Sequence, residues 1–156
     1  MGHPIIRAGN LTDPRVLALV QLHTTAARAA NSNDFFGHAL DVGGLQAPDV
    51  TFWTMWDEDR LAAFGALREI DEALGEVKSM HTAEALRGRG FGGAMLSHIL
   101  DEARRRGYRR VSLETGTAPY FLPAQTLYRR HGFVECGPFG GYPKDPNSLF
   151  MTLSLD

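Results

Sequence analysis

Apolar residues recur at the spacing of a helix in the second half of the chain. The clearest stripe predicts a helix over residues 91–106 and consists of Phe91, Met95, Ile99 and Ala103. Gly107 follows this stripe and suits the left-handed residue that ends many helices. A second helix is predicted over residues 123–131, and Gly132 closes it in the same way. An earlier helix begins near Thr12-Asp13-Pro14 and extends to a break at residues 31–33.

Other segments carry the β-branched and aromatic residues that strands favour. Residues 50–56 and 61–68 form such a pair around the polar turn at 57–59, and a strand over residues 76–82 follows. Further strands are predicted over residues 5–8, 108–114, 133–136 and 149–155. Between residues 31 and 48 we expect a short helix between loops. This order predicts one α/β (α+β) domain spanning residues 1–156, in which an antiparallel meander precedes the long helix.

Composition and charge narrow the function classes. The 156 residues are 44% apolar and 22% charged, with a formal net charge of −2, so the whole protein has no bias toward nucleic acid or anionic membranes. Cys136 is the single cysteine, which excludes an internal disulfide and is typical of a reducing compartment. The sequence shows no secretory leader and no run of about 18 apolar residues. We therefore expect a cytoplasmic protein with no nucleic-acid or membrane partner.

A glycine-rich loop before the long helix carries the strongest chemical signal. Gly88, Gly90 and Gly92 alternate with larger residues, and glycines allow backbone N–H groups to turn toward a ligand. The start of the following helix offers unpaired N–H groups and a positive dipole end, which together favour phosphate. Arg87 and Arg89 add charge that can reach phosphate oxygens. The loop therefore predicts a phosphate-bearing cofactor, and no metal site is predicted.

The same loop also fits a dinucleotide fingerprint. Residues 88–93 satisfy G-x-G-x-x-G, and Glu114 ends a strand about 20 residues further on. A dinucleotide fold needs several parallel βα units, usually starting with the fingerprint. Here an antiparallel meander comes first, and one helix remains after Glu114. The architecture therefore argues against a dinucleotide.

Two motifs in order resemble a known enzyme superfamily. The segment Arg87-x-x-Gly90-x-Gly92, which opens a helix after a strand, resembles the R/Q-x-x-G-x-G/A signature of the GNAT N-acetyltransferases. The segment from Ala124 through Tyr128 to Phe133 is similar to the A-x-x-L-Y-x-x-x-G-F segment of that family. The resemblance implies a mixed, mostly antiparallel sheet of six to seven strands with about four flanking helices. It also implies a splayed strand pair that holds acetyl-CoA.

The resemblance further implies which residues contact the cofactor. The pyrophosphate is expected at the backbone amides of Arg87, Gly88, Arg89, Gly90, Phe91 and Gly92. The pantetheine arm is expected along the preceding strand, at Met80, His81 and Thr82. One position departs from the family: Phe121 stands where an asparagine often contacts the cofactor. That contact is then absent or comes from another group, such as the backbone near residues 115–117.

The catalytic assignments carried over by the resemblance concern two residues. Tyr128 corresponds to the tyrosine that commonly protonates the departing thiolate. Glu76 lies eleven residues ahead of Arg87, the spacing at which histone-acetylating members carry their base. Pairing with Lys78 is the alternative for Glu76. His81 is a second candidate base, which strand alternation places on the opposite side from Glu76 unless a bulge intervenes; a water relay stays open as well.

These observations lead to one main hypothesis. We expect an acetyl-CoA-dependent N-acetyltransferase that acts on an amine of a small molecule or peptide by direct attack in a ternary complex. The alternative is a non-catalytic acyl-CoA-binding or sensing module of the same fold. Residues 31–49 and 137–148 are expected to face the acceptor, which the sequence does not name. A homodimer is left open.

Overall fold

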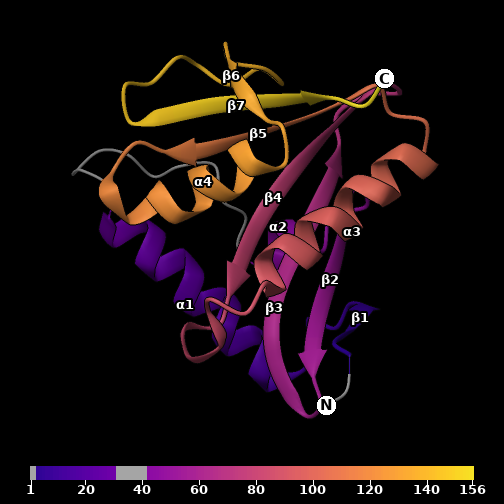
Figure 1. The fold of residues 1–156 in the computed structure, drawn as a ribbon, viewed down its shortest axis with the longest axis vertical. Helices are drawn as coiled ribbons and strands as arrows, with labels where there is room; N and C mark the ends of the chain where they lie inside the picture. Colours follow the sequence, from indigo (N-terminus) through magenta and orange to yellow (C-terminus); the bar gives the residue numbers. More distant parts are fainter. Residues whose placement is uncertain (1–2, 31–41) are drawn as a thin grey trace.

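The computed structural model describes residues 3–30 and 42–156 and contains one seven-stranded sheet (Figure 1). The strand order is β1-β2-β3-β4-β5-β7-β6. Only the β4–β5 pair is parallel, and every other neighbouring pair is antiparallel. The strands are β1 (Ile5–Ala8), β2 (Val50–Asp57), β3 (Arg60–Glu69), β4 (Leu74–Thr82), β5 (Arg110–Gly116), β6 (Val134–Cys136) and β7 (Ser148–Ser154).

Within the described residues, four α-helices and two short 3-10 turns connect these strands. They are α1 (Pro14–Ala30), α2 (Val42–Leu45), η1 (Glu84–Leu86), α3 (Phe91–Arg105), η2 (Pro119–Phe121) and α4 (Leu122–Arg130). The expected fold class, with six to seven strands and about four helices, is confirmed. The predicted boundaries hold to within about two residues, and Asp13 caps α1 by accepting a hydrogen bond from the backbone of Arg15 at 2.8 Å. Residues 31–41, part of the segment in which a short helix is expected, lie outside the described residues.

The helices cover opposite faces of the sheet. On one face, Val16 and Val20 of α1 pack with Phe64 in a small buried cluster. On the other face, α3 packs its apolar stripe on a larger cluster that also includes α4. The fit under α3 is close, because a Cβ on Gly65 would lie 2.9 Å from side-chain atoms of Met95 and Ile99. β4 therefore has α1 on one side and α3 and α4 on the other.

The two halves of the sheet are joined by a short ladder. β4 and β5 pair only from Leu74 to Glu76, opposite Arg110 to Ser112. Beyond this point β4 stays paired with β3, β5 stays paired with β7, and the two strands diverge (Figure 1). The splayed strand pair that the family resemblance implied is therefore present. Its open end exposes unpaired backbone groups of β4, which need partners.

A bulge interrupts β4 just where the strands diverge. Lys78 lies opposite Ala66 and His81 opposite Phe64, so three residues of β4 span the length of two on β3. Ser79 takes a positive φ of 50° at this point. The extra residue reverses the alternation, and Lys78 and His81 share the face that α1 covers. The bulge that the sequence analysis allowed for is therefore present, and it brings His81 to the same face as Lys78.

No helix in the described part of the chain is both long and apolar enough to cross a bilayer. The same residues contain no cluster of three or more His, Cys, Asp or Glu side chains that could hold a metal ion.

Candidate active site

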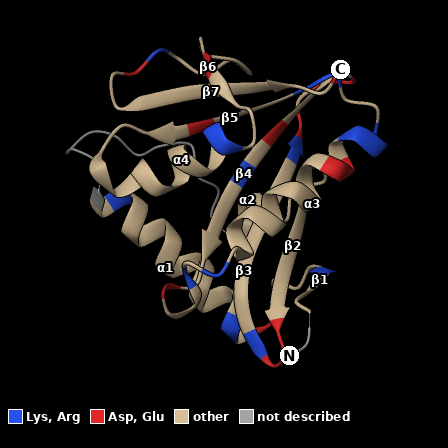
Figure 2. Cartoon of the chain, in the orientation of Figure 1, with Lys and Arg blue, Asp and Glu red and all other residues tan. Residues whose placement is uncertain are grey.

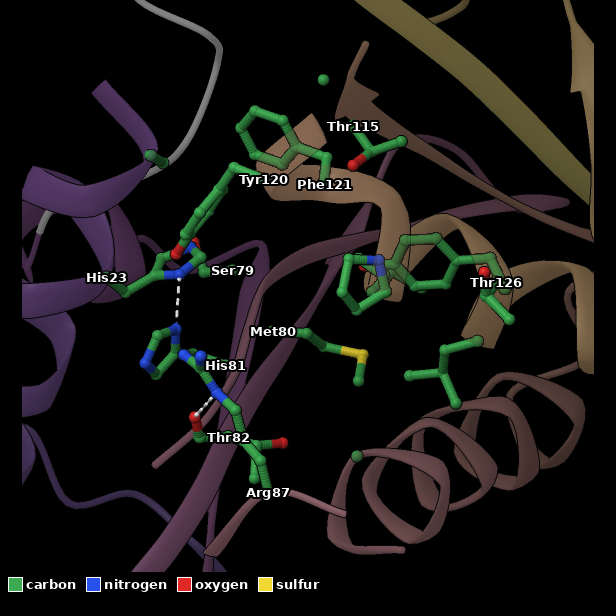
Figure 3. A pocket seen from close by; sticks show the side chains of 18 of the residues that line it. His23, Ser79, Met80, His81, Thr82, Arg87, Thr115, Tyr120, Phe121 and Thr126 are labelled. Atoms are coloured by element: carbon green, nitrogen blue, oxygen red, sulfur yellow. Dashed lines mark hydrogen bonds between the residues drawn. The ribbon is translucent and has the colours of Figure 1, made fainter. Parts of the chain in front are cut away.

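A cavity of about 660 Å³ lies between the diverging ends of β4 and β5. Its walls come from α1, β4, the loop that precedes α3, the end of β5, η2 and α4 (Figure 3). This volume is in the range of small-molecule and cofactor sites. Gln125 fixes one wall, because its side-chain amide donates a 2.8 Å hydrogen bond to the carbonyl of Gly116 and joins α4 to the end of β5.

The start of α3 opens into this cavity. Gly90 is the N-cap residue, with a left-handed φ of 85°, and no side chain caps the helix. The first backbone N–H groups of the helix therefore lack intrahelical partners, and they carry the positive end of the dipole. A Cβ on Gly90 would meet nothing in the chain within 4 Å, so the space in front of the loop is empty. These features fit a diphosphate.

Three arginines of the described residues line the same cavity, Arg28 from α1 and two near the helix start. Arg87 lines it and donates a hydrogen bond of 3.3 Å from Nε to the carbonyl of Thr82 at the end of β4. Arg130, at the end of α4, also lines it. Arg89 does not line the cavity, and its side chain is exposed. The other proposed cofactor residues all do, namely Met80, His81, Thr82, Arg87, Gly88, Gly90, Phe91 and Gly92.

Tyr128 projects from α4 and is 8% exposed. Its ring packs against Phe133 at a centroid distance of 5.9 Å. Burial raises the pKa of Tyr128 to about 12, so the phenol keeps its proton at neutral pH. Within the described residues the hydroxyl has no hydrogen-bond partner. A protonated phenol at the cavity wall can therefore donate its proton to a bound group.

Glu76 lies at the other end of the cavity and is fully buried. Its carboxylate is 3.3 Å from Nζ of Lys78 and 3.5 Å from Nη1 of Arg68, and it accepts hydrogen bonds from the hydroxyl of Tyr142. Burial raises the pKa of Glu76, whereas Lys78, Tyr142 and Arg68 oppose that rise. Figure 2 marks charged positions of both signs on β4 and an acidic position on β5 where the strands part. The proposed pairing of Glu76 with Lys78 is present.

His81 faces α1, where it meets a second histidine. The Nδ1 atoms of His81 and His23 are 3.1 Å apart, so one ring donates and the other accepts (Figure 3). Nε2 of His81 is buried without a hydrogen-bond partner in the described structure. Burial lowers the pKa of each imidazole to about 4, so both rings are neutral at pH 7. With Nδ1 occupied and Nε2 enclosed, His81 has no nitrogen free to face a ligand.

The comparisons with known proteins decide the family. Residues 17–133 match the profile of the acetyltransferase (GNAT) family. The chain belongs to the GNAT acetyltransferase family. This GNAT chain is 43% identical over 150 residues to a Bacillus subtilis protein described as the uncharacterized N-acetyltransferase YsnE, covering 96% of the chain and 99% of the relative. The expected family and enzyme class are confirmed.

Solved structures share the fold of this GNAT acetyltransferase. A Klebsiella pneumoniae protein assigned as an acyl-CoA N-acyltransferase superposes with a TM-score of 0.80 at 25% identity, covering 98% of each chain. An Elizabethkingia anophelis GNAT acetyltransferase, solved with acetyl-CoA bound, superposes with a TM-score of 0.71 at 16% identity over 99% of this chain and 100% of its own. The second match shows the fold alone.

Several cavity residues of this GNAT acetyltransferase were not predicted. Neither sequence motif gave Arg130 a role in binding the cofactor. His23 and Arg28 come from α1, to which the sequence assigned no cavity residue. Amphipathic spacing could have shown which face of α1 is buried, but not that its C-terminal half reaches β4. Phe121, which replaces the family asparagine, lines the cavity with its ring close over Gly116, where any Cβ would clash with it.

Proposed function

We propose that this chain transfers the acetyl group of acetyl-CoA to an amine of a small molecule or peptide, by direct attack in a ternary complex. The observation that carries the proposal is that three features line one cavity. They are a helix start that is rich in glycine and has no side-chain cap, a protonated tyrosine and a buried carboxylate. A diphosphate carrier fits the first of these features, and proton transfer fits the other two.

Different residues around the cavity would bind different parts of acetyl-CoA. The backbone at Gly88, Gly90 and Gly92 would hold the diphosphate, with Arg87 and Arg130 as cationic partners. The unpaired edge of β4 near Met80 would hydrogen-bond the amide-containing arm. The thioester supplies the acetyl group, which forms an amide with the amine as the carbon–sulfur bond breaks.

Proton transfer is assigned to two side chains. An ammonium acceptor must lose two protons overall, one before attack and one as the amide forms. Glu76 would accept the first, because burial raises its pKa above that of an ordinary carboxyl. Tyr128 would give its proton to the departing thiolate and regain one from the acceptor nitrogen, which leaves one net proton for solvent. Glu76 is preferred to His81 because His23 already occupies Nδ1 of His81 and its Nε2 is enclosed.

Release of free CoA thiol in the presence of a panel of amines tests this function. We expect amine-dependent thiol release, and a loss of about 10²- to 10⁴-fold in kcat/KM for Glu76→Gln with at least one substrate amine. If the chain binds acetyl-CoA but none of the amines causes release of thiol, the chain is a non-catalytic acyl-CoA module instead. No binding of acetyl-CoA in a thermal-shift assay would contradict both.

A further inference from the structure

Tyr142 lies in the loop between β6 and β7, far in sequence from the strand it contacts. Its hydroxyl is 2.9 and 3.0 Å from the two carboxylate oxygens of Glu76. The same oxygen is 2.9 Å from Nζ of Lys78 and 3.3 Å from Nη1 of Arg68. A single phenol oxygen therefore joins the three charged groups at the end of the cavity.

These contacts match the hydrogen-bonding capacity of a phenol. A tyrosine hydroxyl has one proton to donate and lone pairs that accept. Lys78 and Arg68 are donors only, so Tyr142 accepts from both of them and gives its proton to Glu76. The direction of the Tyr142–Glu76 hydrogen bond is thereby fixed, and it favours the ionised carboxylate.

The ring of Tyr142 is held independently of its hydroxyl. It stacks on Phe150 of β7 at a centroid distance of 6.3 Å and meets Phe139 edge-on at 5.5 Å. The ammonium of Lys78 also lies 5.3 Å from the ring centroid. The hydroxyl can therefore be removed while the ring keeps most of its packing.

Tyr142 acts from behind the cavity wall. Glu76 and Lys78 both line the cavity, whereas Tyr142 and Arg68 do not. The phenol contacts two side chains of the cavity wall, Glu76 and Lys78, without lining the cavity itself. Tyr142 therefore reaches the cavity through its contacts with Glu76 and Lys78.

We propose that Tyr142 is a positioning residue for Glu76, the side chain proposed to accept a proton from the amine. The Tyr142 hydroxyl holds the Glu76 carboxylate in place and in its ionised form. This inference rests on the catalytic role proposed for Glu76. It makes the loop between β6 and β7 part of the active site, because the loop carries the group that sets the state of the carboxylate.

Other charged groups around Glu76 bear on its protonation. Lys78 on the same strand and Arg68 on β3 both face the carboxylate and favour its ionised form. Glu114 on β5 acts on Lys78 and on Tyr142. Tyr142 itself contributes an uncharged donor. Its removal leaves the charges unchanged, so the effect of the hydroxyl alone can be measured.

Tyr142→Phe tests the inference with two readouts. The first is the ¹³C NMR titration of the Glu76 side-chain carboxyl, assigned by its loss in Glu76→Gln; we expect the midpoint to rise by about one pH unit in Tyr142→Phe. The second is kcat/KM for the amine, which we expect to fall about tenfold, with its acidic limb moved to higher pH. In the Glu76→Gln background, Tyr142→Phe should change kcat/KM less than twofold.

Tyr108→Phe is a matched control, because Tyr108 donates a 2.8 Å hydrogen bond to Glu69 outside the cavity. It should leave the Glu76 titration and kcat/KM unchanged. An unshifted Glu76 midpoint in Tyr142→Phe would overturn the inference, as would equal losses from that substitution with and without Glu76. A third outcome separates the two proposals: the Glu76 midpoint shifts in Tyr142→Phe, but Tyr142→Phe and Glu76→Gln both keep full turnover. Tyr142 would then set the ionisation of Glu76, and the catalytic role of Glu76 would be refuted.

A second probe applies if Tyr142→Phe does not fold. 3-Fluorotyrosine at position 142 keeps the ring and makes the hydroxyl a stronger donor. The Glu76 midpoint should then fall below that of the natural protein. A midpoint that stays in place would contradict the inference.

Discussion

His23 of α1 and His81 of β4 share one hydrogen between Nδ1 atoms that are 3.1 Å apart. The two rings meet edge-on at a centroid distance of 5.0 Å, and His81 also stacks on Phe64. A single hydrogen at this position requires at least one neutral ring. The pair therefore joins α1 to the cavity strand only while at least one ring is neutral.

The first prediction concerns stability at mildly acidic pH. The pKa of each imidazole falls from 6.5 to about 4 on folding, because burial disfavours the cation. Between these values the unfolded chain binds more protons than the folded one, so stability rises with pH and is lost as the pH falls from 6.5 toward 4. The loss should be on the order of 3 kcal/mol for each ring.

Urea unfolding of the natural protein and of a His23→Asn/His81→Asn double variant, from pH 7 to pH 4.5, measures this effect. The variant should show a clearly flatter dependence on pH. His98→Asn, outside the cavity on α3, is the control and should follow the natural protein. Parallel curves for all three proteins would show that the pair does not limit acid stability.

The second prediction concerns Tyr128. Tyr128→Phe removes the hydroxyl and keeps the ring packed on Phe133. We expect kcat to fall by about 10²-fold, because the thiolate loses its proton donor, while the Kd of acetyl-CoA changes little. Stopped-time thiol release gives kcat, and calorimetric titration gives Kd. Since the pKa of Tyr128 is about 12, the natural protein should show no loss of activity from its ionisation below about pH 11.

The third prediction separates two glycines. Gly90→Ala places a side chain at φ 85°, which costs roughly 1–2 kcal/mol of stability. Its methyl group also projects where the diphosphate is expected, so acetyl-CoA should bind at least about tenfold more weakly. Gly137→Ala is the matched control, since its backbone is not left-handed and its Cβ meets nothing within 4 Å. Equal Kd values for the two variants would place the diphosphate elsewhere.

The fourth prediction compares two neighbouring arginines. Arg87 lines the cavity and Arg89 does not. Arg87→Gln should weaken acetyl-CoA binding about tenfold or more, because a charge-assisted contact is lost. Arg89→Gln should cost less than about threefold, through screened long-range attraction that added salt removes. A larger loss for Arg89→Gln would reverse this assignment.

Much of this arrangement could be predicted from the sequence, because the signals are local. The apolar stripe of α3, the glycines at its start and the Ala124 to Phe133 segment each depend on residues within about ten positions. The family resemblance then supplied the splayed strands. Tyr128 follows from the same segment, and the structure places it at the cavity wall.

The remainder depends on contacts that local patterns do not encode. Tyr142 meets Glu76 across 66 positions, and His23 meets His81 across 58. The β4 bulge has no sequence signal either, because its left-handed residue is Ser79 rather than the glycine or asparagine that φ above zero favours. Strand alternation without that bulge would place His81 on the face of β4 opposite Lys78.

β4 separates the two apolar clusters of the molecule, and at its open end residues on both of its faces line one cavity. Its Val77 side packs with α3 and the helix start that suits a diphosphate, while its Lys78 and His81 side faces α1. Because α1 and the start of α3 form different walls of that cavity, substitutions on α1 change one wall and leave the helix start that suits a diphosphate unchanged. Relatives with the same donor half can therefore diverge in the molecules they modify.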